Sequence, residues 1–131
     1  LKNMIMDIKP ELKYTKDHEW IEIDGKIATV GITDYAQGEL GDIVYVEIET
    51  LDENLEKEEV FGSVEAVKTV SDLFLPVSGK IVEVNQKIEN SPEIINEDPY
   101  NDGWIIKMEI ENEEELNELL DADAYSKLIG L

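Results

Sequence analysis

The chain has 131 residues, 32 acidic residues and 11 basic residues, all of them lysine, which give a formal net charge of −21 at pH 7. This length is typical of one domain and suffices to bury a core without disulfides or a structural metal. The chain has no cysteine, which excludes a thiolate nucleophile, a cysteine-ligated zinc site and an iron–sulfur cluster. The negative charge repels polyanions, so neither nucleic acid nor an anionic membrane is an expected partner.

The longest uninterrupted apolar segment is Leu73–Val77, far shorter than the about 18 residues that a membrane span needs. We therefore expect a soluble chain with no membrane partner. The first residue is Leu1 rather than Met, and from this we expect that an upstream segment has been removed or left out.

Short alternating or apolar runs, separated by turn residues, predict a series of strands. In chain order they are residues 20–23, 26–32, 43–48, 60–67, 80–84 and 104–110. Asp24-Gly25 is the hairpin turn between the first two. Many short strands at this spacing predict an all-β sandwich or small barrel, with its strand core at about 14–110 in a single domain 1–131.

The expected helices are short and peripheral. Thr33 is expected to cap a turn over residues 34–37 that ends at Gly38 or Gly41. Ser91 is expected to cap a second helix that begins at Pro92 and ends before Pro99.

A C-terminal helical segment is expected at about 112–131. Asn112 supplies its first cap, and Asp123 is expected to start a second turn. Leu116, Leu119 and Leu120 share one face of the first part, and the second turn runs through Tyr125, Leu128 and Ile129.

Three patterns suggest chemistry, and each has a simpler explanation. Residues 98–109 resemble a calcium-binding loop, but Tyr100 occupies a ligand position and the second half reads as a strand, so we predict a turn and no metal. Asp17-His18-Glu19 places the chain's one histidine between two carboxylates; adjacent strand residues face opposite ways, so a surface histidine is predicted rather than a catalytic triad. The acidic segment 49–59 is interpreted as a solvated connection, with a partner-binding loop as the alternative.

Lys68 is the remaining candidate. It lies between two apolar strand-like runs, Val64–Val67 and Val70–Val77. A lysine at the tip of such a hairpin is displayed to solvent on a rigid support and is accessible to a modifying enzyme. Most lysines are merely solvated, so spacing alone leaves both interpretations open.

The whole chain resembles the lipoyl-carrier H proteins of the glycine cleavage system. The matching segments run from Tyr14 nearly to the C-terminus and are highly specific in combination. They are residues 14–20, 30–37, 40–46, 62–68, 76–85, 91–93, 96–100 and 103–104. The resemblance implies a lipoyl-type β-sandwich or flattened barrel with short peripheral and C-terminal helices.

The resemblance also implies the function of a non-catalytic carrier whose cofactor is lipoic acid, held in amide linkage on Lys68. Its implied partners are the decarboxylating glycine dehydrogenase, which loads the aminomethyl group of glycine, the aminomethyltransferase, which unloads it, and dihydrolipoamide dehydrogenase, which takes the electrons. A lipoate ligase or a lipoyl/octanoyl transferase would attach the cofactor. The implied compartment is the cytoplasm in a prokaryote and the mitochondrial matrix in a eukaryote.

In this family the loaded arm folds into a cleft of the carrier. The positions that match this cleft are Glu19 and Asp72, with His18 beside them. The chain departs from the usual pattern at Asp17, at Ala66, at Thr69, and in the connection 48–54. None of these departures removes the attachment lysine.

Alternatives remain open at this point. A lipoyl domain of a 2-oxo acid dehydrogenase would lack His18-Glu19-Trp20 and the C-terminal helical segment, and a biotin carrier would have Met on both sides of the lysine. A lipoate-relay or regulatory protein would look the same in sequence as a glycine cleavage carrier. An unmodified acidic interaction module would carry no covalent adduct.

Overall fold

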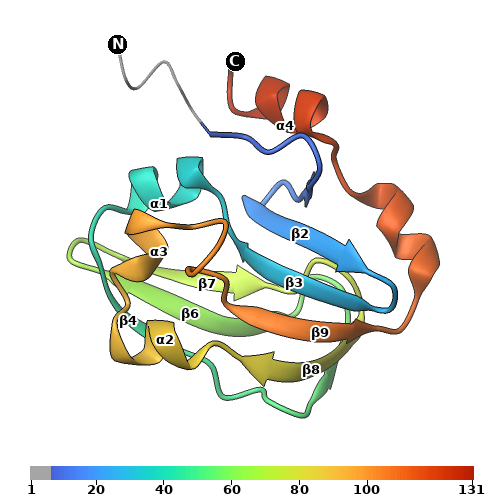
Figure 1. Ribbon diagram of the computed structural model, residues 1–131, viewed down its shortest axis with the longest axis horizontal. Coiled ribbons are helices and arrows are strands. Elements are labelled where there is room, and N and C mark those ends of the chain that lie inside the picture. Colours follow the sequence, from blue (N-terminus) through green and yellow to red (C-terminus); the bar gives the residue numbers. More distant parts are fainter. Residues whose placement is uncertain (1–6) are drawn as a thin grey trace.

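The computed structural model describes residues 7–131, which form two antiparallel sheets with short helices at their margins (Figure 1). The first sheet has the strand order β1-β2-β3-β9-β8-β5, and the second has the order β4-β6-β7. In Figure 1 the first sheet lies in front of the second. The all-β sandwich predicted from the sequence is confirmed, and the two sheets do not close into a barrel.

The elements are bounded as follows. The strands of the first sheet are β1 (Lys13–Tyr14), β2 (Glu19–Asp24), β3 (Ile27–Ile32), β9 (Ile106–Ile110), β8 (Gly79–Val84) and β5 (Asn54–Leu55). Those of the second sheet are β4 (Ile43–Glu47), β6 (Val60–Ala66) and β7 (Val70–Phe74). The helical elements are α1 (Asp34–Leu40), α2 (Gln86–Asn90), α3 (Ile94–Glu97), the 3-10 helix η2 (Glu113–Glu118) and α4 (Ala122–Leu128).

The predicted strands are all present, and their ends differ from the prediction by one or two residues. The last strand begins at Ile106 rather than at residue 104. The side-chain amide of Asn85 donates to the carbonyls of Asp102 and Trp104 at 2.8 and 2.7 Å, so the carbonyl of Trp104 is bonded to a side chain rather than to a neighbouring strand. Strands β1 and β5 have two residues each and are too short to produce an alternating pattern.

The helix caps differ from the prediction at two places. Helix α1 begins after Thr33 and ends at Gly41, which has a positive φ, as one of the two predicted ends has it. Ser91 is the C-cap of α2, so it does not start the next helix. The N-cap of α4 is Asp121, whose side chain accepts from the backbone N–H of Ala124.

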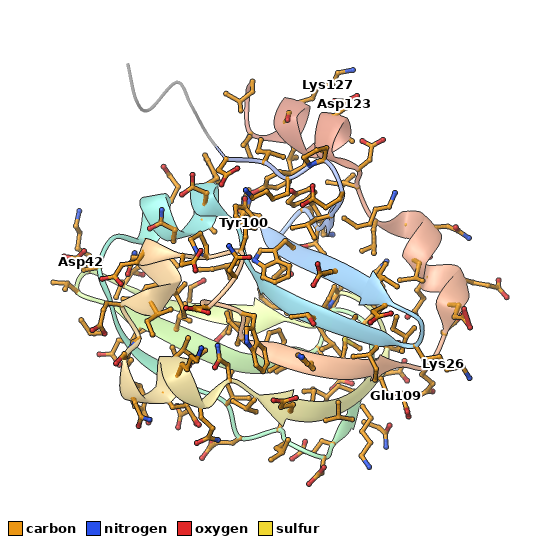
Figure 2. All side chains as sticks on the ribbon, in the orientation of Figure 1. Lys26, Asp42, Tyr100, Glu109, Asp123 and Lys127 are labelled. Atoms are coloured by element: carbon orange, nitrogen blue, oxygen red, sulfur yellow. The ribbon has the colours of Figure 1, made fainter. Side chains whose placement is uncertain are left out.

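The predictions for Ser91 and Asp123 were therefore wrong. Pro92 lies in the turn after α2, and α3 begins at Ile94 without a side-chain cap. Asp123 lies in the first turn of α4, and Figure 2 shows it on the outer side of that helix. Asp and Asn residues are frequent near both positions, so the sequence offered several candidate caps within one turn.

The main core lies between the two sheets and is made of buried aliphatic side chains. A second cluster lies at the N-terminal end of β2, where the side chains of Tyr14, Trp20 and Tyr125 are fully buried and that of Leu12 is buried as well. The rings of Tyr14 and Tyr125 stack with centroids 4.7 Å apart. Through Tyr125, the C-terminal helix α4 is joined to the sheet beside the turn that precedes β2.

Among residues 7–131, no helix is long and apolar enough to cross a membrane. Glu19 is the one charged side chain in this part of the chain that is buried. It lies at the start of β2, beside the second sheet, and it belongs to the site described next.

Candidate functional site

Lys68 lies at the tip of the hairpin that joins β6 to β7, where the sequence predicts it. Strand pairing runs up to Glu65 and Val70, and the N–H of Ala66 donates to the carbonyl of Thr69 at 2.7 Å. Val67 and Lys68 are the two residues at the tip. Residues 67–70 are all exposed, and within the described chain Lys68 takes part in no ion pair.

The hairpin is tied to the connection between α1 and β4. The N–H of Val67 donates to the carbonyl of Asp42 at 3.1 Å, and Figure 2 shows Asp42 beside the end of this hairpin. Asn96 of α3 holds the same connection, because it accepts from the N–H of Ile43 and donates to the carbonyl of Gly41, both at 2.9 Å. The support of Lys68 therefore extends through Asp42 to α3.

A cleft of about 240 Å³ opens next to this hairpin, between the two sheets. Strands β6 and β7 line one side, and the turn before β2 together with one face of α1 lines the other. Its residues are Asp17, His18, Glu19, Ile32, Tyr35, Ala36, Glu39, Leu40, Val64, Ser71, Asp72 and Leu73. The cleft thus combines aliphatic walls with four acidic side chains and contains no lysine.

The turn from Thr15 to Glu19 places two of the predicted residues at the cleft. The hydroxyl oxygen of Thr15 accepts from the N–H groups of Asp17 and Glu19, both at 3.2 Å. His18 has a positive φ of 70°, which is uncommon for a residue with a side chain. Asp17 and His18 precede β2, so the strand alternation used in the argument against a catalytic triad does not apply to them.

The carboxyl group of Glu19 connects the two sheets. One oxygen accepts from the hydroxyl of Thr15 at 2.8 Å, and the other accepts from the N–H of Phe74 on β7 at 3.1 Å. The residue is only 2% exposed. Burial raises the pKa of Glu19 to about 8, although both hydrogen bonds oppose this shift, so the neutral carboxyl group is favoured at pH 7.

His18 is half-buried, not on the open surface as the sequence predicts. Its Nδ1 lies 2.9 Å from the hydroxyl oxygen of Tyr125. The imidazole is also 5.0 Å from the ring of Tyr35 on α1, measured between centroids. Burial lowers the pKa of His18, while the charges of Asp17 and Glu39 act in the opposite direction.

The structure brings three of the four predicted site residues to one cleft and places the fourth beside it. His18, Glu19 and Asp72 all line the cleft, and Lys68 lies at the end of the hairpin that forms its wall. Asp72 is exposed and pairs with Ser63, and it also lines a shallower hollow on that side of the second sheet. Asp72 therefore lies at the rim of the cleft, whereas Glu19 lies in its wall.

Sequence reasoning missed the contribution of α1 to the cleft. Tyr35 and Glu39 both line the cleft, and their spacing of four residues places them on one face of the helix. That spacing was a usable signal, since Thr33 already marked where the helix begins. The hydroxyl of Tyr125 was missed as well, because its position on an apolar helix face predicts burial and says nothing of a polar contact.

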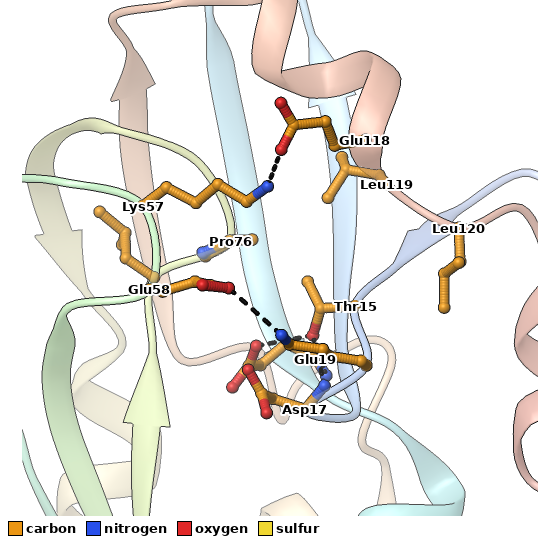
Figure 3. Close-up of a pocket in the computed structure, with 11 residues that line it drawn as sticks. Thr15, Asp17, Glu19, Lys57, Glu58, Pro76, Glu118, Leu119 and Leu120 are labelled. Atoms are coloured by element: carbon orange, nitrogen blue, oxygen red, sulfur yellow. Dashed lines mark hydrogen bonds and ion pairs between the residues drawn. The ribbon is translucent and has the colours of Figure 1, made fainter.

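A second pocket, of about 260 Å³ (Figure 3), adjoins the cleft, because Asp17 and Glu19 line both. Leu75, Pro76, Leu119 and Leu120 form much of its lining. Two ion pairs cross its rim, one between Lys57 and Glu118 and one between Lys16 and Glu58 at 3.6 Å. Both pairs involve the turn between β5 and β6, which they join to η2 and to the turn before β2.

The other two patterns noted in the sequence are accounted for locally. Asp98 accepts from the side chain of Asn101 and the N–H of Asp102, at 3.2 and 3.1 Å, within a turn that leads to β9. The acidic segment 49–59 is mostly exposed and contains the short strand β5. The predicted turn is confirmed, and the exposure of residues 49–59 fits both the solvated connection and the partner-binding loop.

Comparison with known proteins yields the same family by sequence and by structure. The model of the family described as Glycine cleavage H-protein matches residues 12–130. The glycine cleavage system H protein of Staphylococcus epidermidis (strain ATCC 12228) is 56% identical over 125 residues, which cover 95% of this chain and 99% of that protein. The H protein of Staphylococcus haemolyticus is 53% identical over the same lengths.

The crystal structure of a glycine cleavage system H protein from Mycobacterium marinum is also similar to this chain. It matches with a TM-score of 0.83 and 39% sequence identity. The match covers 95% of this chain and 100% of that one.

Proposed function

Because the chain belongs to the glycine cleavage H-protein family, we propose that Lys68 is the residue on which it carries lipoic acid. The chain is a lipoyl carrier of the glycine cleavage system, which moves the aminomethyl group of glycine between enzymes. When bound, lipoic acid supplies the sulfur atoms that take up this group and afterwards the electrons. The chain's own residues present the arm and shelter its end.

The observation that carries the assignment of Lys68 is its place at the tip of an exposed hairpin beside the cleft. An attaching enzyme must bring its active centre to the Nζ atom itself, and residues 67–70 leave that atom accessible. The backbone under Lys68 is fixed by the β6–β7 ladder and by the bond from Val67 to Asp42. Accessibility on a fixed support is the requirement for a carrier lysine.

The cleft fits an apolar arm that ends in a cation. At a rise of about 3.3 Å per residue, the part of β7 that lines the cleft, Ser71–Leu73, lies about 10–16 Å along the strand from Lys68. Ile32, Leu40, Val64 and Leu73 offer aliphatic contacts, and the acidic residues favour a positive charge. The lining therefore suits a lysine side chain lengthened by an acyl chain, with an amine at its end.

Within this cleft we assign Asp72 and Glu19 to the protection of the bound amine, with His18 beside them. A positive charge in the cleft would lower the pKa of Glu19, because an opposite charge favours the carboxylate. Asp72→Asn or Glu19→Ala is expected to shorten the lifetime of the loaded arm in water several-fold. Asp52→Asn, a change in an exposed turn, is the control. An unchanged lifetime in both cleft variants would contradict the protective role of Asp72 and Glu19.

The carrier itself catalyses no step in this proposal. Its partners are the decarboxylating glycine dehydrogenase, the aminomethyltransferase and dihydrolipoamide dehydrogenase, together with a lipoate ligase or a lipoyl/octanoyl transferase. The chain acts as one carrier domain. Since the relatives named above are bacterial, we place its work in a bacterial cytoplasm.

Intact-mass measurement after incubation with a lipoate ligase, ATP and lipoate tests the attachment site. One lipoyl adduct is expected on the unsubstituted chain and none on Lys68→Arg, which keeps the charge. Lys127→Arg, a change at an exposed position of α4, is the matched control and should be modified normally. An adduct on Lys68→Arg, or no adduct on the unsubstituted chain, would refute the assignment.

Exchange of the glycine carboxyl group with bicarbonate, catalysed by the decarboxylating dehydrogenase, separates the carrier from a lipoate-relay protein. The lipoylated chain is expected to support this exchange, and the Lys68→Arg chain is expected not to. A chain that is lipoylated and supports no exchange would favour the relay function.

A further inference from the structure

Three polar groups from distant parts of the chain form a buried series next to the cleft. The hydroxyl oxygen of Tyr125 lies 2.7 Å from that of Thr33 and 2.9 Å from Nδ1 of His18. Tyr125 and Thr33 are fully buried, at 0% exposure each. Burial also raises the pKa of Tyr125 to about 12, so its hydroxyl proton is present throughout the physiological range.

The direction of these hydrogen bonds follows from counting protons. Each hydroxyl has one proton to donate, and the neutral imidazole has one N–H and one basic nitrogen. Either Thr33 donates to Tyr125 and Tyr125 donates to His18, or the order is reversed and His18 donates first. In both orders the hydroxyl of Tyr125 donates one hydrogen bond and accepts one, so the hydrogen bonds of Thr33 determine which order is favoured.

In the described part of the chain, the hydroxyl oxygen of Thr33 has two hydrogen-bond partners. They are the hydroxyl of Tyr125 and the N–H of Ala36, which donates to it at 3.2 Å as the helix cap. The N–H of Ala36 can only donate, so it cannot take the proton of Thr33. If Tyr125 donated to Thr33, the Thr33 proton would be buried without an acceptor, which is costly. The favoured order therefore runs from Thr33 to Tyr125 to Nδ1 of His18.

We propose that Tyr125, oriented by Thr33, is a positioning residue that holds His18 as the neutral tautomer with its proton on Nε2. The basic nitrogen then faces the protein interior, and the ring presents an N–H donor on its other edge. Since His18 lines the cleft and its Nδ1 is bonded to Tyr125, Nε2–H is the ring's remaining polar group for an occupant of the cleft. This inference rests on the proposed function only for the identity of what occupies the cleft.

The consequence for the carrier is that its cleft contains a histidine without a free basic nitrogen. An imidazole that presents its lone pair to the cleft is a general base for water, which is unwanted where a labile group is stored. A protonated ring would add a positive charge to a site that is to hold a cation. The neutral Nε2–H form avoids both effects. The hydrogen bond that selects this form comes from Tyr125 of α4, which does not line the cleft.

The chain has one histidine, so its ¹⁵N imidazole spectrum contains a single set of signals that needs no assignment by mutation. In the unmodified chain at neutral pH, long-range ¹H–¹⁵N correlation is expected to show Nδ1 unprotonated and Nε2 protonated. Tyr125→Phe is expected to lower the ratio of the Nε2–H to the Nδ1–H tautomer by about five-fold, the effect of a hydrogen bond of about 1 kcal/mol. It is also expected to raise the titration midpoint of the ring.

Control variants separate this role from packing. Tyr35→Phe keeps the other aromatic contact of His18 and is expected to leave the tautomer ratio unchanged. Thr33→Val should shift the ratio in the same direction as Tyr125→Phe, and Thr33→Ser should restore it. An Nδ1–H or doubly protonated ring in the unsubstituted chain, or an unchanged ratio in Tyr125→Phe, would overturn the proposal. Because the spectra use unmodified protein, that result would leave the assignment of Lys68 untouched.

Discussion

At the scale of single residues, Glu19 has the strongest effect on the electrostatics of the fold. Its carboxyl group is buried between the sheets and accepts hydrogen bonds from Thr15 and Phe74. Burial favours the protonated form, so the folded chain binds a proton here that the unfolded chain releases near pH 4.5. Folding is thus coupled to proton binding at this one residue.

The pH dependence of stability follows from the sign of this shift. Between the unfolded pKa of 4.5 and the folded pKa of about 8, the folded state holds more protons, so the contribution of Glu19 to stability falls as pH rises. Glu19→Gln keeps the neutral shape and cannot ionise. Relative to the original chain, this variant is expected to gain stability from pH 5 to pH 8, by at most about 5 kcal/mol.

Urea unfolding at several pH values measures this difference directly. Glu59→Gln, at an exposed position, is the control for the loss of one negative charge and should show little pH-dependent gain. If Glu19→Gln and the original chain kept a constant difference across this range, Glu19 would be ionised in the folded state throughout.

At the scale of elements, the support of the hairpin between β6 and β7 depends on Asn96. Its side chain accepts from Ile43 and donates to Gly41 and to the side chain of Gln37, all at 2.9 Å. Asn96→Ala is expected to lower the free energy of unfolding by about 1–3 kcal/mol, since it leaves backbone groups unpaired. It should also speed hydrogen exchange at the amide of Val67.

Denaturant unfolding and amide exchange followed by NMR test this expectation together. Asn101→Ala is the control, because its exposed side chain makes one bond, to Asp98, and its removal should change stability by less than about 0.5 kcal/mol. A destabilised Asn96→Ala with unchanged exchange at Val67 would show that α3 does not hold the hairpin.

Two glycines provide a contrasting pair within regular structure. A Cβ on Gly79 of β8 would lie 2.2 Å from the carbonyl oxygen of Glu109, whereas a Cβ on Gly38 of α1 would meet nothing within 4 Å. Gly79→Ala is expected to cost more than about 2 kcal/mol, because the backbones of β8 and β9 must separate. Gly38→Ala is expected to stabilise by about 0.5–1 kcal/mol. Thermal unfolding of both variants is the test, and equal effects would contradict the packing described here.

The same elements show how far sequence reasoning reaches. Strands with alternating side chains were predictable, because their pattern reflects the face they bury. The caps of α3 and α4 were not, since Ser91, Asp121 and Asp123 are equally good candidates on local grounds and only the path of the chain decides among them. Two-residue strands such as β1 leave no pattern at all.

In the candidate site, too, local features were predictable from the sequence and contacts between distant segments were not. The place of Lys68 at a hairpin tip was predictable, because the tip and its flanking strands are local in the sequence. The cleft was reached through the resemblance to a family, because it joins residues 17–19, α1 and β7, which lie far apart in the chain. The series from Thr33 through Tyr125 to His18 spans up to 107 residues, and no local pattern marks a hydrogen bond over such a separation.

At the scale of the whole molecule, the net charge of −21 acts on every encounter of the carrier. The exposed acidic residues surround a fold with 11 lysines, of which four are held in ion pairs with acidic neighbours in the described part. A field of one sign accelerates association with basic surfaces without requiring tight binding. A carrier that visits several enzymes in turn benefits from fast encounter and fast release.

We therefore expect the partner enzymes to present basic surfaces around their access channels, and the Michaelis constant of the carrier as a substrate to depend on salt. Raising the ionic strength from about 0.05 to about 0.3 M shortens the screening length to well below the size of the molecule. With the decarboxylating glycine dehydrogenase, the KM for the lipoylated chain should rise several-fold while the turnover number changes little. The KM for glycine in the same assay is the control, because a small zwitterion is not steered by a long-range field. A carrier KM that stayed constant across this range would show that contact surfaces, rather than the charge of the whole molecule, set the rate of encounter.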